Sequence, residues 1–534
     1  MGKPMNQKEE FFHILILLLC LLLFFFHLGT RPLWDTDEGM HASTSKDMVL
    51  SGDWITPTFN GENFYDKPIL HNWLVSISFL IFGFTEFAAR FPSAILGLGG
   101  VMITYLLGRR MFGPMAGLLS GAILATNVEY TMLSRFVVHD ISLCFFMTLA
   151  MFFFYEGFVD ERHRRRSFIL FYISLGFAVL AKGPVGVVLP GFIIGLFLIL
   201  KRKLSFLKEM EIGWGILIFL AVAAPWYLLI SMRNSDYGWY FFIHNNLMRF
   251  LSPRAQHHQP FYYYFLALSG GFFPWSCFLP LSVVQAFRGQ FKKIAEGTLF
   301  LLLWFFVIFI FFSAASSKLS TYILPLFPAA SLLVGSLWYD LMNAMTPKLH
   351  KGYVYSFIPL LLILPLVLFY FWVGPPTYYA SKYGIDFLRY AYLVCWVGGG
   401  AFLSFYLGLK SRLKASFWTL GLTLVSVSVF VEWAILPTLD PYFSTKGLAQ
   451  KLNQMVPPGE KLVFINSVKE AALFYTNRRA LILRSPKEVI NFLSSDKRVY
   501  CIVNKGLYED LDNVKKMSYI IDEDGGKLIL SNQR

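Results

Sequence analysis

The sequence has few charged residues for its length. Of its 534 residues, 15% are Asp, Glu, Lys or Arg, whereas a soluble domain has about 25%. Hydrophobic residues make up 56% of the chain, and the mean hydropathy is +0.54. These values exclude an ordinary soluble protein and predict an integral membrane protein of the helical kind.

Cysteine is also scarce, and its spacing points to no shared site. The five cysteines are Cys20, Cys144, Cys277, Cys395 and Cys501. Four of them lie in apolar segments, and none belongs to a Cys-x-x-Cys pair. The pattern predicts neither a disulfide framework nor a cysteine metal site.

Several functional signatures are missing. The sequence contains no GxGxxG motif, no P-loop and no internal repeat. Repeated halves and charges at the membrane midplane would favour a transporter, and neither is present. The net charge of +14 comes from basic residues in short loops between apolar runs. Membrane topology explains that excess, so no nucleic-acid partner is predicted.

Long apolar runs fill most of the chain. Phe11–Leu28 and Tyr353–Val373 approach the roughly 20 residues that a spanning helix needs. Because no small-residue cleavage site follows the first run, we predict an uncleaved first span. Together with it, the apolar runs give about 13 spans, the others lying near residues 90–107, 114–130, 141–158, 167–181, 184–200, 212–231, 262–284, 298–313, 321–339, 353–373, 387–408 and 416–436.

The basic loops set the orientation. Lys and Arg concentrate in alternate loops, which are predicted to be cytoplasmic. The apolar stretch Ile69–Phe84 would reverse this pattern if it crossed the membrane, so we predict a helix lying at the outer interface. An odd number of spans then places the C-terminus outside. The predicted domains are a membrane domain over residues 1–440, with a first outer loop at 30–88, and a C-terminal domain over 441–534.

The C-terminal domain has a different pattern. Strand-like runs at Leu462–Ile465, Ala480–Leu483 and Val499–Val503 alternate with helical patterns at Val468–Tyr475 and Pro486–Leu493. This alternation predicts a small α/β domain.

Charged residues collect on the predicted outer side. The stretch Leu33–Pro68 is rich in Asp and Glu and ends in Tyr-Asp-Lys-Pro. Later outer turns add His139, Arg135, Glu129 and the loop 236–264. Each alone is typical of a helix-end anchor or an interfacial aromatic belt. Together, cations beside carboxylates suit an anionic phosphate substrate, and the aromatic residues suit a lipid chain and a sugar.

These residues carry a family resemblance. The sequence resembles the GT-C membrane glycosyltransferases that use polyprenyl-phosphate sugars. It is most similar to the undecaprenyl phosphate-aminoarabinose lipid A transferases, which are related to the dolichyl-phosphate-mannose protein mannosyltransferases. The matching motifs are Asp37-Glu38, SGDWITP at 51–57, YDKP at 65–68, ARFPSA at 89–94, Asp140, AKGPVG at 181–186, WYFFIHNNLMRF at 239–250, HHQPFYYY at 257–264 and SSKLSTYILPLFPA at 316–329.

The resemblance implies a role for each matching residue. It implies a catalytic centre, contacts to the donor phosphate, a cleft for sugar and acceptor, and a divalent metal site for Zn or for Mg or Mn. The catalytic residues are Asp37, Glu38 and Asp140, and the contacts to the donor phosphate are Lys67, Arg249, Tyr322 and Lys318. The cleft for sugar and acceptor contains Tyr65, Arg90, Lys182 and His257, and the metal ligands are Asp66 and His244. Two departures stand out, because the family usually has Glu in place of Asp66 and often has Arg in place of Met40.

The resemblance also implies a function. We expect an inverting glycosyltransferase of the GT-C fold, a monomer in the bacterial inner membrane with its active site and C-terminal domain in the periplasm. It would move an amino sugar or hexose from undecaprenyl phosphate to lipid A, within a bilayer that supplies both lipids. The alternatives are a protein O-glycosyltransferase of the mannosyl type and a transporter of lipid-linked sugars.

Overall fold

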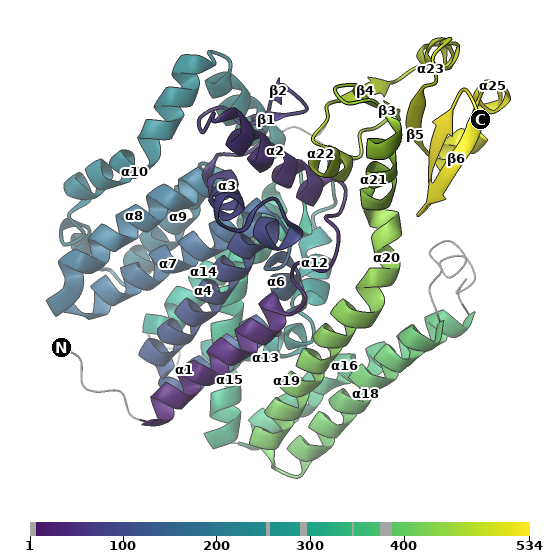
Figure 1. Ribbon diagram of the computed structural model, residues 1–534. Helices are drawn as coiled ribbons and strands as arrows, with labels where there is room; N and C mark the ends of the chain where they lie inside the picture. The colour runs from purple at the N-terminus through teal and green to yellow at the C-terminus, as the bar shows by residue number, and fades with distance from the viewer. Residues whose placement is uncertain (1–6, 252–256, 289–295, 344–345, 374–386) are drawn as a thin grey trace.

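Long helices form a bundle, and a small sheet stands at one end of it (Figure 1). The computed structural model describes residues 7–251, 257–288, 296–343, 346–373 and 387–534. The longer helices are α1 (Gln7–Cys20), α4 (Glu86–Phe112), α5 (Pro114–Ala125), α7 (His139–Val159), α8 (Arg164–Lys182), α9 (Val185–Leu200), α10 (Ile212–Arg233), α14 (Glu296–Ala314), α15 (Phe327–Asn343), α16 (Pro347–Val373), α18 (Phe387–Leu409) and α19 (Leu413–Phe430).

Shorter elements lie at the ends of the long helices and between them. They are η1 (Leu21–Phe25), α2 (Asp37–Ser51), β1 (Thr58–Phe59), β2 (Glu62–Asn63), α3 (Leu70–Phe82), α6 (Val128–Leu133), η2 (Glu161–His163), η3 (Leu204–Lys208), η4 (Trp239–Met248), α11 (Arg249–Leu251), α12 (Tyr263–Gly271), η5 (Trp275–Phe278), α13 (Leu279–Arg288), η6 (Ser320–Leu326), η7 (Val431–Ile435) and α20 (Leu436–Phe443).

The membrane architecture predicted from the sequence is confirmed. In the described ranges, seven helices are long and apolar enough to cross a membrane, and the bent pair formed by α12 and the helix after it would make an eighth. Shorter apolar helices, α5 and α9 among them, coincide with other predicted spans. The total of about 13 spans stays a prediction, as does the interfacial placement of α3, which has 13 residues.

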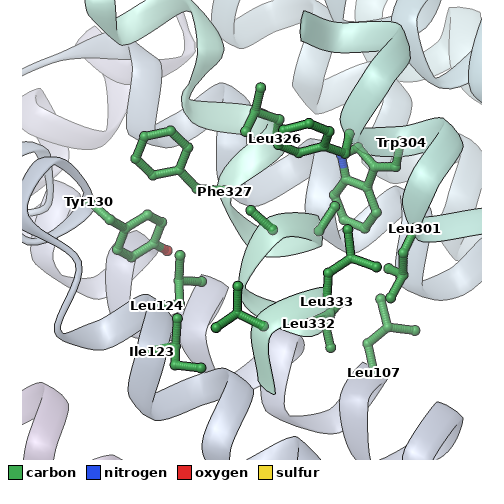
Figure 2. Packing of buried hydrophobic residues seen from close by; sticks show 14 of the residues in the cluster. Leu107, Ile123, Leu124, Tyr130, Leu301, Trp304, Leu326, Phe327, Leu332 and Leu333 are labelled. Atoms are coloured by element: carbon green, nitrogen blue, oxygen red, sulfur yellow. The ribbon is translucent and has the colours of Figure 1, made fainter. Parts of the chain in front are cut away.

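Small residues allow the bundle helices to approach closely. A Cβ on Gly117 of α5 would lie 2.5 Å from the Tyr105 carbonyl of α4, and one on Gly335 of α15 would lie 2.1 Å from Ser120. Close backbone approach of this kind is what holds helices together in lipid, where apolar burial alone gives no preference. Around this contact, Tyr130, Trp304 and neighbouring leucines fill the core (Figure 2).

The C-terminal region is a five-stranded sheet with helices on both faces. Its strands are β3 (Leu462–Ile465), β4 (Ala480–Leu483), β5 (Tyr500–Asn504), β6 (Tyr519–Asp524) and β7 (Lys527–Ser531), in the order β4-β3-β5-β7-β6. The first three are parallel, and β7 joins antiparallel to β5 and β6. The helices are α21 (Lys446–Met455), α22 (Glu470–Thr476), α23 (Pro486–Leu493), α24 (Lys505–Glu509) and α25 (Asp512–Met517).

Strand β3 shows why both faces of the sheet are covered. Its four residues are all buried, and successive side chains of a strand point to opposite faces. Leu462 and Phe464 pack with α21 and α22, whereas Val463 and Ile465 pack with α23 and α25. The α/β pattern of the sequence is therefore present, although the division of the chain at residue 441 stays a prediction.

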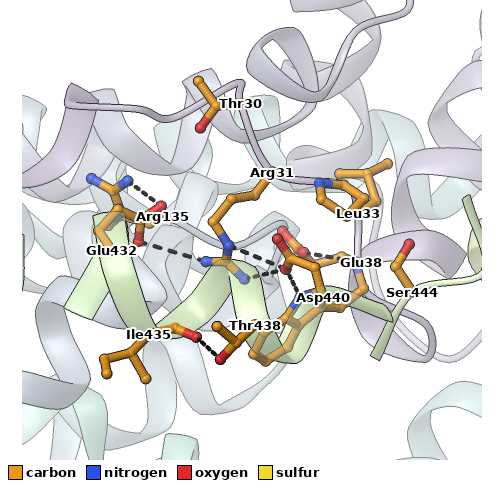
Figure 3. Close-up of polar contacts among 12 residues, drawn as sticks. Thr30, Arg31, Leu33, Glu38, Arg135, Glu432, Ile435, Thr438, Asp440 and Ser444 are labelled. Atoms are coloured by element: carbon orange, nitrogen blue, oxygen red, sulfur yellow. Dashed lines mark hydrogen bonds and ion pairs between the residues drawn. The ribbon is translucent and has the colours of Figure 1, made fainter. Parts of the chain in front are cut away.

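Charged side chains join the first loop to the last helices of the bundle (Figure 3). Arg31 Nη2 donates to Asp440 Oδ1 at 3.0 Å, and Arg31 also forms an ion pair with Glu432 at 3.5 Å. Glu432 pairs in turn with Arg135 at 2.8 Å, and the Trp34 indole donates to Asp440 at 2.8 Å. The segment just before α2 is thus fixed by residues about four hundred positions later in the sequence.

Candidate functional site

A cavity of about 500 Å³ opens where the first loop meets α8, η4 and the turn before η6. Its lining combines polar side chains, Lys67 among them, with aromatic and aliphatic side chains. The polar lining comprises Asp66, Lys67, Lys182, Asn245, Asn246, Arg249, Ser317 and Tyr322. The apolar lining includes Val185, Val188, Phe241, Phe242, Leu247, Phe250, Phe311 and Phe312.

Three cations meet at the polar part of this cavity. Lys182, the last residue of α8, forms an ion pair with Asp140 in the first turn of α7, and its ammonium lies 4.4 Å from the Tyr322 ring centre. The pKa of Lys67 is lowered to about 8, mainly by burial and then by the nearby Lys182 and Arg249, while Asp66 and Asp140 act in the opposite direction. Positive charges close enough to lower the pKa of a neighbouring lysine are favourable for binding an anion.

Asp37 begins α2 beside this cluster. Partial desolvation by the surrounding protein raises the pKa of Asp37, and the charge of Asp140 raises it further. Lys67, Lys182 and His257 act in the opposite direction. The side chain remains open to solvent, and within the described ranges it forms no hydrogen bond or ion pair. An open carboxylate with a raised pKa, close to the cations, has the properties of a general base.

Glu38 and Arg90 lie together, but in a buried ion pair. Arg90 Nε and Nη2 donate to the two Glu38 oxygens at 2.8 Å each, and the two side chains are 4% and 1% exposed. Glu38 also accepts the backbone N–H of Trp34 at 3.1 Å, and Arg90 donates to the backbone carbonyls of Leu28, Arg31 and Pro32. These contacts favour a structural role for both residues, unlike the catalytic and cleft roles that the resemblance implied.

Replacing Glu38 with alanine should therefore reduce stability. The change leaves the Arg90 guanidinium buried without its carboxylate, which costs about 3–5 kcal/mol. The measurement is thermal unfolding of the purified protein in detergent, with Glu62→Ala, an exposed glutamate in the same loop, as the matched control. An unchanged melting midpoint together with lost activity would instead favour the catalytic role.

The other predicted residues occupy varied positions. Lys318 is 5% exposed and donates its ammonium to the carbonyls of Gln259 and Ala315, so it fastens two loop segments and does not line the cavity. Tyr65 packs edge-on against Tyr237, next to the cavity residue Asp66. His257 is exposed in a loop, with a left-handed backbone at φ 61°.

Both residues of the predicted metal pair contact Tyr240. The Tyr240 hydroxyl donates to Asp66 at 3.1 Å, and its ring stacks on His244 with centres 5.4 Å apart. Among the residues that the structure describes, no group of three or more His, Cys, Asp or Glu side chains is arranged to hold a metal ion. Two protein donors do not make a closed site, so the metal stays a prediction and carries no step of the chemistry below.

Some residues at the site were not predicted. Asn245, Asn246 and the paired phenylalanines Phe241 and Phe242 reach the cavity from η4, whose wider π-helical turn changes which positions share a face. Three histidines, His41, His71 and His139, also pack together nearby, with ring centres 4.3 and 4.9 Å apart. The motif WYFFIHNNLMRF contained the first group, but nothing in the sequence joins the three histidines.

Comparisons with known proteins identify related chains. Residues 66–228 match the family model described as dolichyl-phosphate-mannose-protein mannosyltransferase. An undecaprenyl phosphate-alpha-4-amino-4-deoxy-L-arabinose arabinosyl transferase from Shewanella sediminis is 31% identical over 422 residues, which cover 77% of this chain and 74% of the relative. A protein of the same name from Aeromonas salmonicida is 34% identical over 59% of this chain, and the match spans only 58% of that relative's length.

Solved structures show the same fold. The structure of ArnT from Cupriavidus metallidurans bound to undecaprenyl phosphate matches with a TM-score of 0.83 at 22% identity, covering 97% of this chain and 98% of that one. The archaeal oligosaccharyltransferase AglB from Archaeoglobus fulgidus matches with a TM-score of 0.55 at 13% identity, covering 99% and 75%. The predicted GT-C architecture with its small C-terminal sheet is thereby confirmed.

Proposed function

We propose that this chain, which belongs to the family of undecaprenyl phosphate-alpha-4-amino-4-deoxy-L-arabinose arabinosyl transferases, is an inverting glycosyltransferase. It moves a sugar from undecaprenyl phosphate to lipid A, and the names of its relatives favour aminoarabinose as that sugar. The observation that carries the proposal is the meeting of Lys67, Lys182 and Arg249 at the polar part of an otherwise apolar cavity.

The cations suit the phosphate of the donor. Lys67 and Arg249 both line the cavity, and Arg249 is oriented by its Nε–H donating to Ser317 Oγ at 3.4 Å. Arginine binds phosphate through a planar fork of donors, whereas lysine acts as a point charge. Negative charge grows on this phosphate as the sugar leaves, so cations already in place stabilise the transition state more than the bound donor.

The apolar lining suits the isoprenoid chain. Val185 and Val188 of α9, Phe241 and Phe242 of η4, and Phe311 of α14 line the same cavity as the cations. A lipid chain placed along them would hold its phosphate at the charged end. Binding energy from this unreactive part of the donor then contributes to positioning the reacting carbon.

Transfer is a single displacement. The acceptor oxygen forms a bond to the anomeric carbon of the sugar while the bond from that carbon to the donor phosphate oxygen breaks, and the phosphate leaves with the electron pair. When the acceptor is a hydroxyl, its proton goes to Asp37. When the acceptor is a phosphate of lipid A, it is already an anion, and the cations hold it next to the leaving group. One displacement inverts the configuration of the sugar.

The proposed function also implies where the enzyme lies in the cell. We place the enzyme in the bacterial inner membrane, with the cavity and the C-terminal sheet on the periplasmic side, where donor and acceptor lipids are both accessible. The basic loops predicted to be cytoplasmic support this orientation. A protein O-glycosyltransferase is the second candidate, and the family-model match over residues 66–228 is the observation that favours it.

Purified enzyme in nanodiscs tests the choice. Given lipid A and undecaprenyl phosphate-aminoarabinose, it should yield lipid A heavier by one aminoarabinose in mass spectrometry, because the cavity combines a cluster of cations with an apolar lining. The matched control is the Lys67→Ala enzyme, which should modify lipid A about 30- to 1,000-fold more slowly. If lipid A stays unchanged with every donor while a Ser/Thr-rich exported protein gains a hexose, the protein-glycosylation function is correct.

A further inference from the structure

The backbone immediately before Asp37 has an unusual conformation. Thr36 has φ 74° and ψ −118°, a region that glycine enters freely and a β-branched residue almost never does. Because Asp37 is the next residue and the first of α2, the Thr36 dihedral angles decide where its carboxylate lies. Contacts must hold this conformation, since threonine would otherwise leave it.

Those contacts come from the C-terminal sheet region. The Thr36 backbone N–H donates to Glu470 Oε2 at 3.0 Å. On the other side of the same turn, Asp35 Oδ1 accepts the backbone N–H of Ala471 at 3.2 Å and the hydroxyl of Thr445 at 2.8 Å. Asp35 also pairs with Lys527 at 3.7 Å, in a contact where the two side chains are 11% and 5% exposed.

Helix α2 starts directly on α22, which begins at Glu470. A Cβ added to Gly39 would lie 2.4 Å from the backbone nitrogen of Ala471, so the two helices touch through their backbones. Ser43 Oγ, one turn further along α2, donates to the Glu470 carbonyl at 3.4 Å. The first turn of α2 therefore packs backbone against backbone on α22, and the Ser43 hydrogen bond holds the next turn to the same helix.

We propose that Glu470 is a positioning residue, which holds Thr36 in its positive-φ conformation and so places the Asp37 carboxylate at the donor cavity. This assigns the C-terminal sheet region a part in the transfer step, and it rests on the proposed function. In the part of the chain that the structure describes, Glu470 makes no contact with Lys67 or Arg249, which bind the donor phosphate in that proposal. Loss of Glu470 therefore lowers kcat and leaves the KM for donor nearly unchanged.

The test compares four variants. Glu470→Ala should lower kcat by about 10- to 100-fold, the scale on which a misplaced catalytic group acts. Glu470→Gln keeps an acceptor oxygen and should stay near wild type. Adding Thr36→Gly to Glu470→Ala should restore much of kcat, because glycine adopts the positive φ without help. The matched control Lys446→Ala breaks a different contact of the same docked region, the ion pair with Glu86, and should keep wild-type kcat.

Hydrogen exchange gives a readout that needs no substrate. The amide of Thr36, followed in a peptide covering residues 33–40, should exchange faster in Glu470→Ala and at the wild-type rate in Glu470→Gln and Lys446→Ala. If wild-type protein transfers no sugar, the proposed function fails while this measurement still tests the contact. The inference is overturned if Glu470→Ala keeps wild-type kcat, if Lys446→Ala loses as much activity, or if Thr36→Gly restores nothing.

Discussion

Replacing Lys67 with alanine should lower the rate of sugar transfer by about 30- to 1,000-fold. A charged contact to phosphate lost from a site of low dielectric constant removes about 2–4 kcal/mol of transition-state stabilisation. Arg249→Ala should have an effect of the same size, since both cations line the cavity. The measurement is the initial rate with purified enzyme at equal protein concentration.

A matched control separates phosphate binding from a general effect of charge. Arg233 ends α10 and forms an exposed ion pair with Asp53 at 2.9 Å, outside the cavity. Surface pairs of this kind contribute little, so Arg233→Ala should keep wild-type activity. If Lys67→Ala and Arg249→Ala are as active as Arg233→Ala, both residues only anchor the protein at the membrane interface.

The pH dependence of kcat/KM gives a second signature of Lys67. Its pKa is lowered to about 8, so the ammonium form, which binds the donor, is present below that pH and is lost as pH rises through it. We expect kcat/KM to fall on the alkaline side near pH 8, because this parameter reports the free enzyme. Lys67→Arg, whose guanidinium stays charged, should move that fall to higher pH.

Replacing Asp37 with asparagine should lower kcat by about 100- to 10,000-fold, the usual range for loss of a general base. Asparagine keeps the shape of the side chain and removes its ability to accept a proton. The pKa of Asp37 is raised by the surrounding protein and by Asp140. The base form is therefore lost as pH falls through a value above the ordinary range for aspartate, and wild-type activity should decline with it.

The control for Asp37 is an aspartate of the same loop that takes no part in transfer. Asp53 accepts the backbone N–H groups of Ile55 and Thr56 within that loop, so Asp53→Asn should leave kcat and its acidic limb unchanged. Near wild-type transfer by Asp37→Asn would mean that the acceptor is ionised before it binds. Lipid A phosphate would then be the attacking group.

Local patterns in the sequence predicted local structure well. Strands β3 and β4 and helix α23 have the predicted bounds, because each combines a short apolar run with clear ends. The hairpin of β6 and β7 was not predicted. The Gly525-Gly526 turn between these strands was its signal, since paired glycines suit tight hairpins.

Residues whose role depends on distant partners could not be read from the sequence. Glu38 stands next to Asp37, yet its carboxylate is taken up by Arg90, 52 positions away. Lys318 has the positive charge that would bind a phosphate, yet its ammonium donates hydrogen bonds to backbone carbonyls instead. Neither interaction produces a local sequence pattern from which it could be predicted. Lys67, Arg249 and Tyr322 could be matched through their motifs, and the structure brings all three to one cavity.

The pairing of Arg31 with Asp440 has a consequence for how the protein is made. The two residues are 409 positions apart, and at about 5–20 residues per second the ribosome needs roughly 20–80 s between them. Throughout that interval the nascent chain carries Arg31, joined later by Arg135, at the edge of the bilayer without their carboxylates, an arrangement that membranes tolerate poorly. A chain terminated before Glu432 keeps both cations unpaired permanently, so premature stop codons should yield protein that membrane proteases remove, and no partly active enzyme.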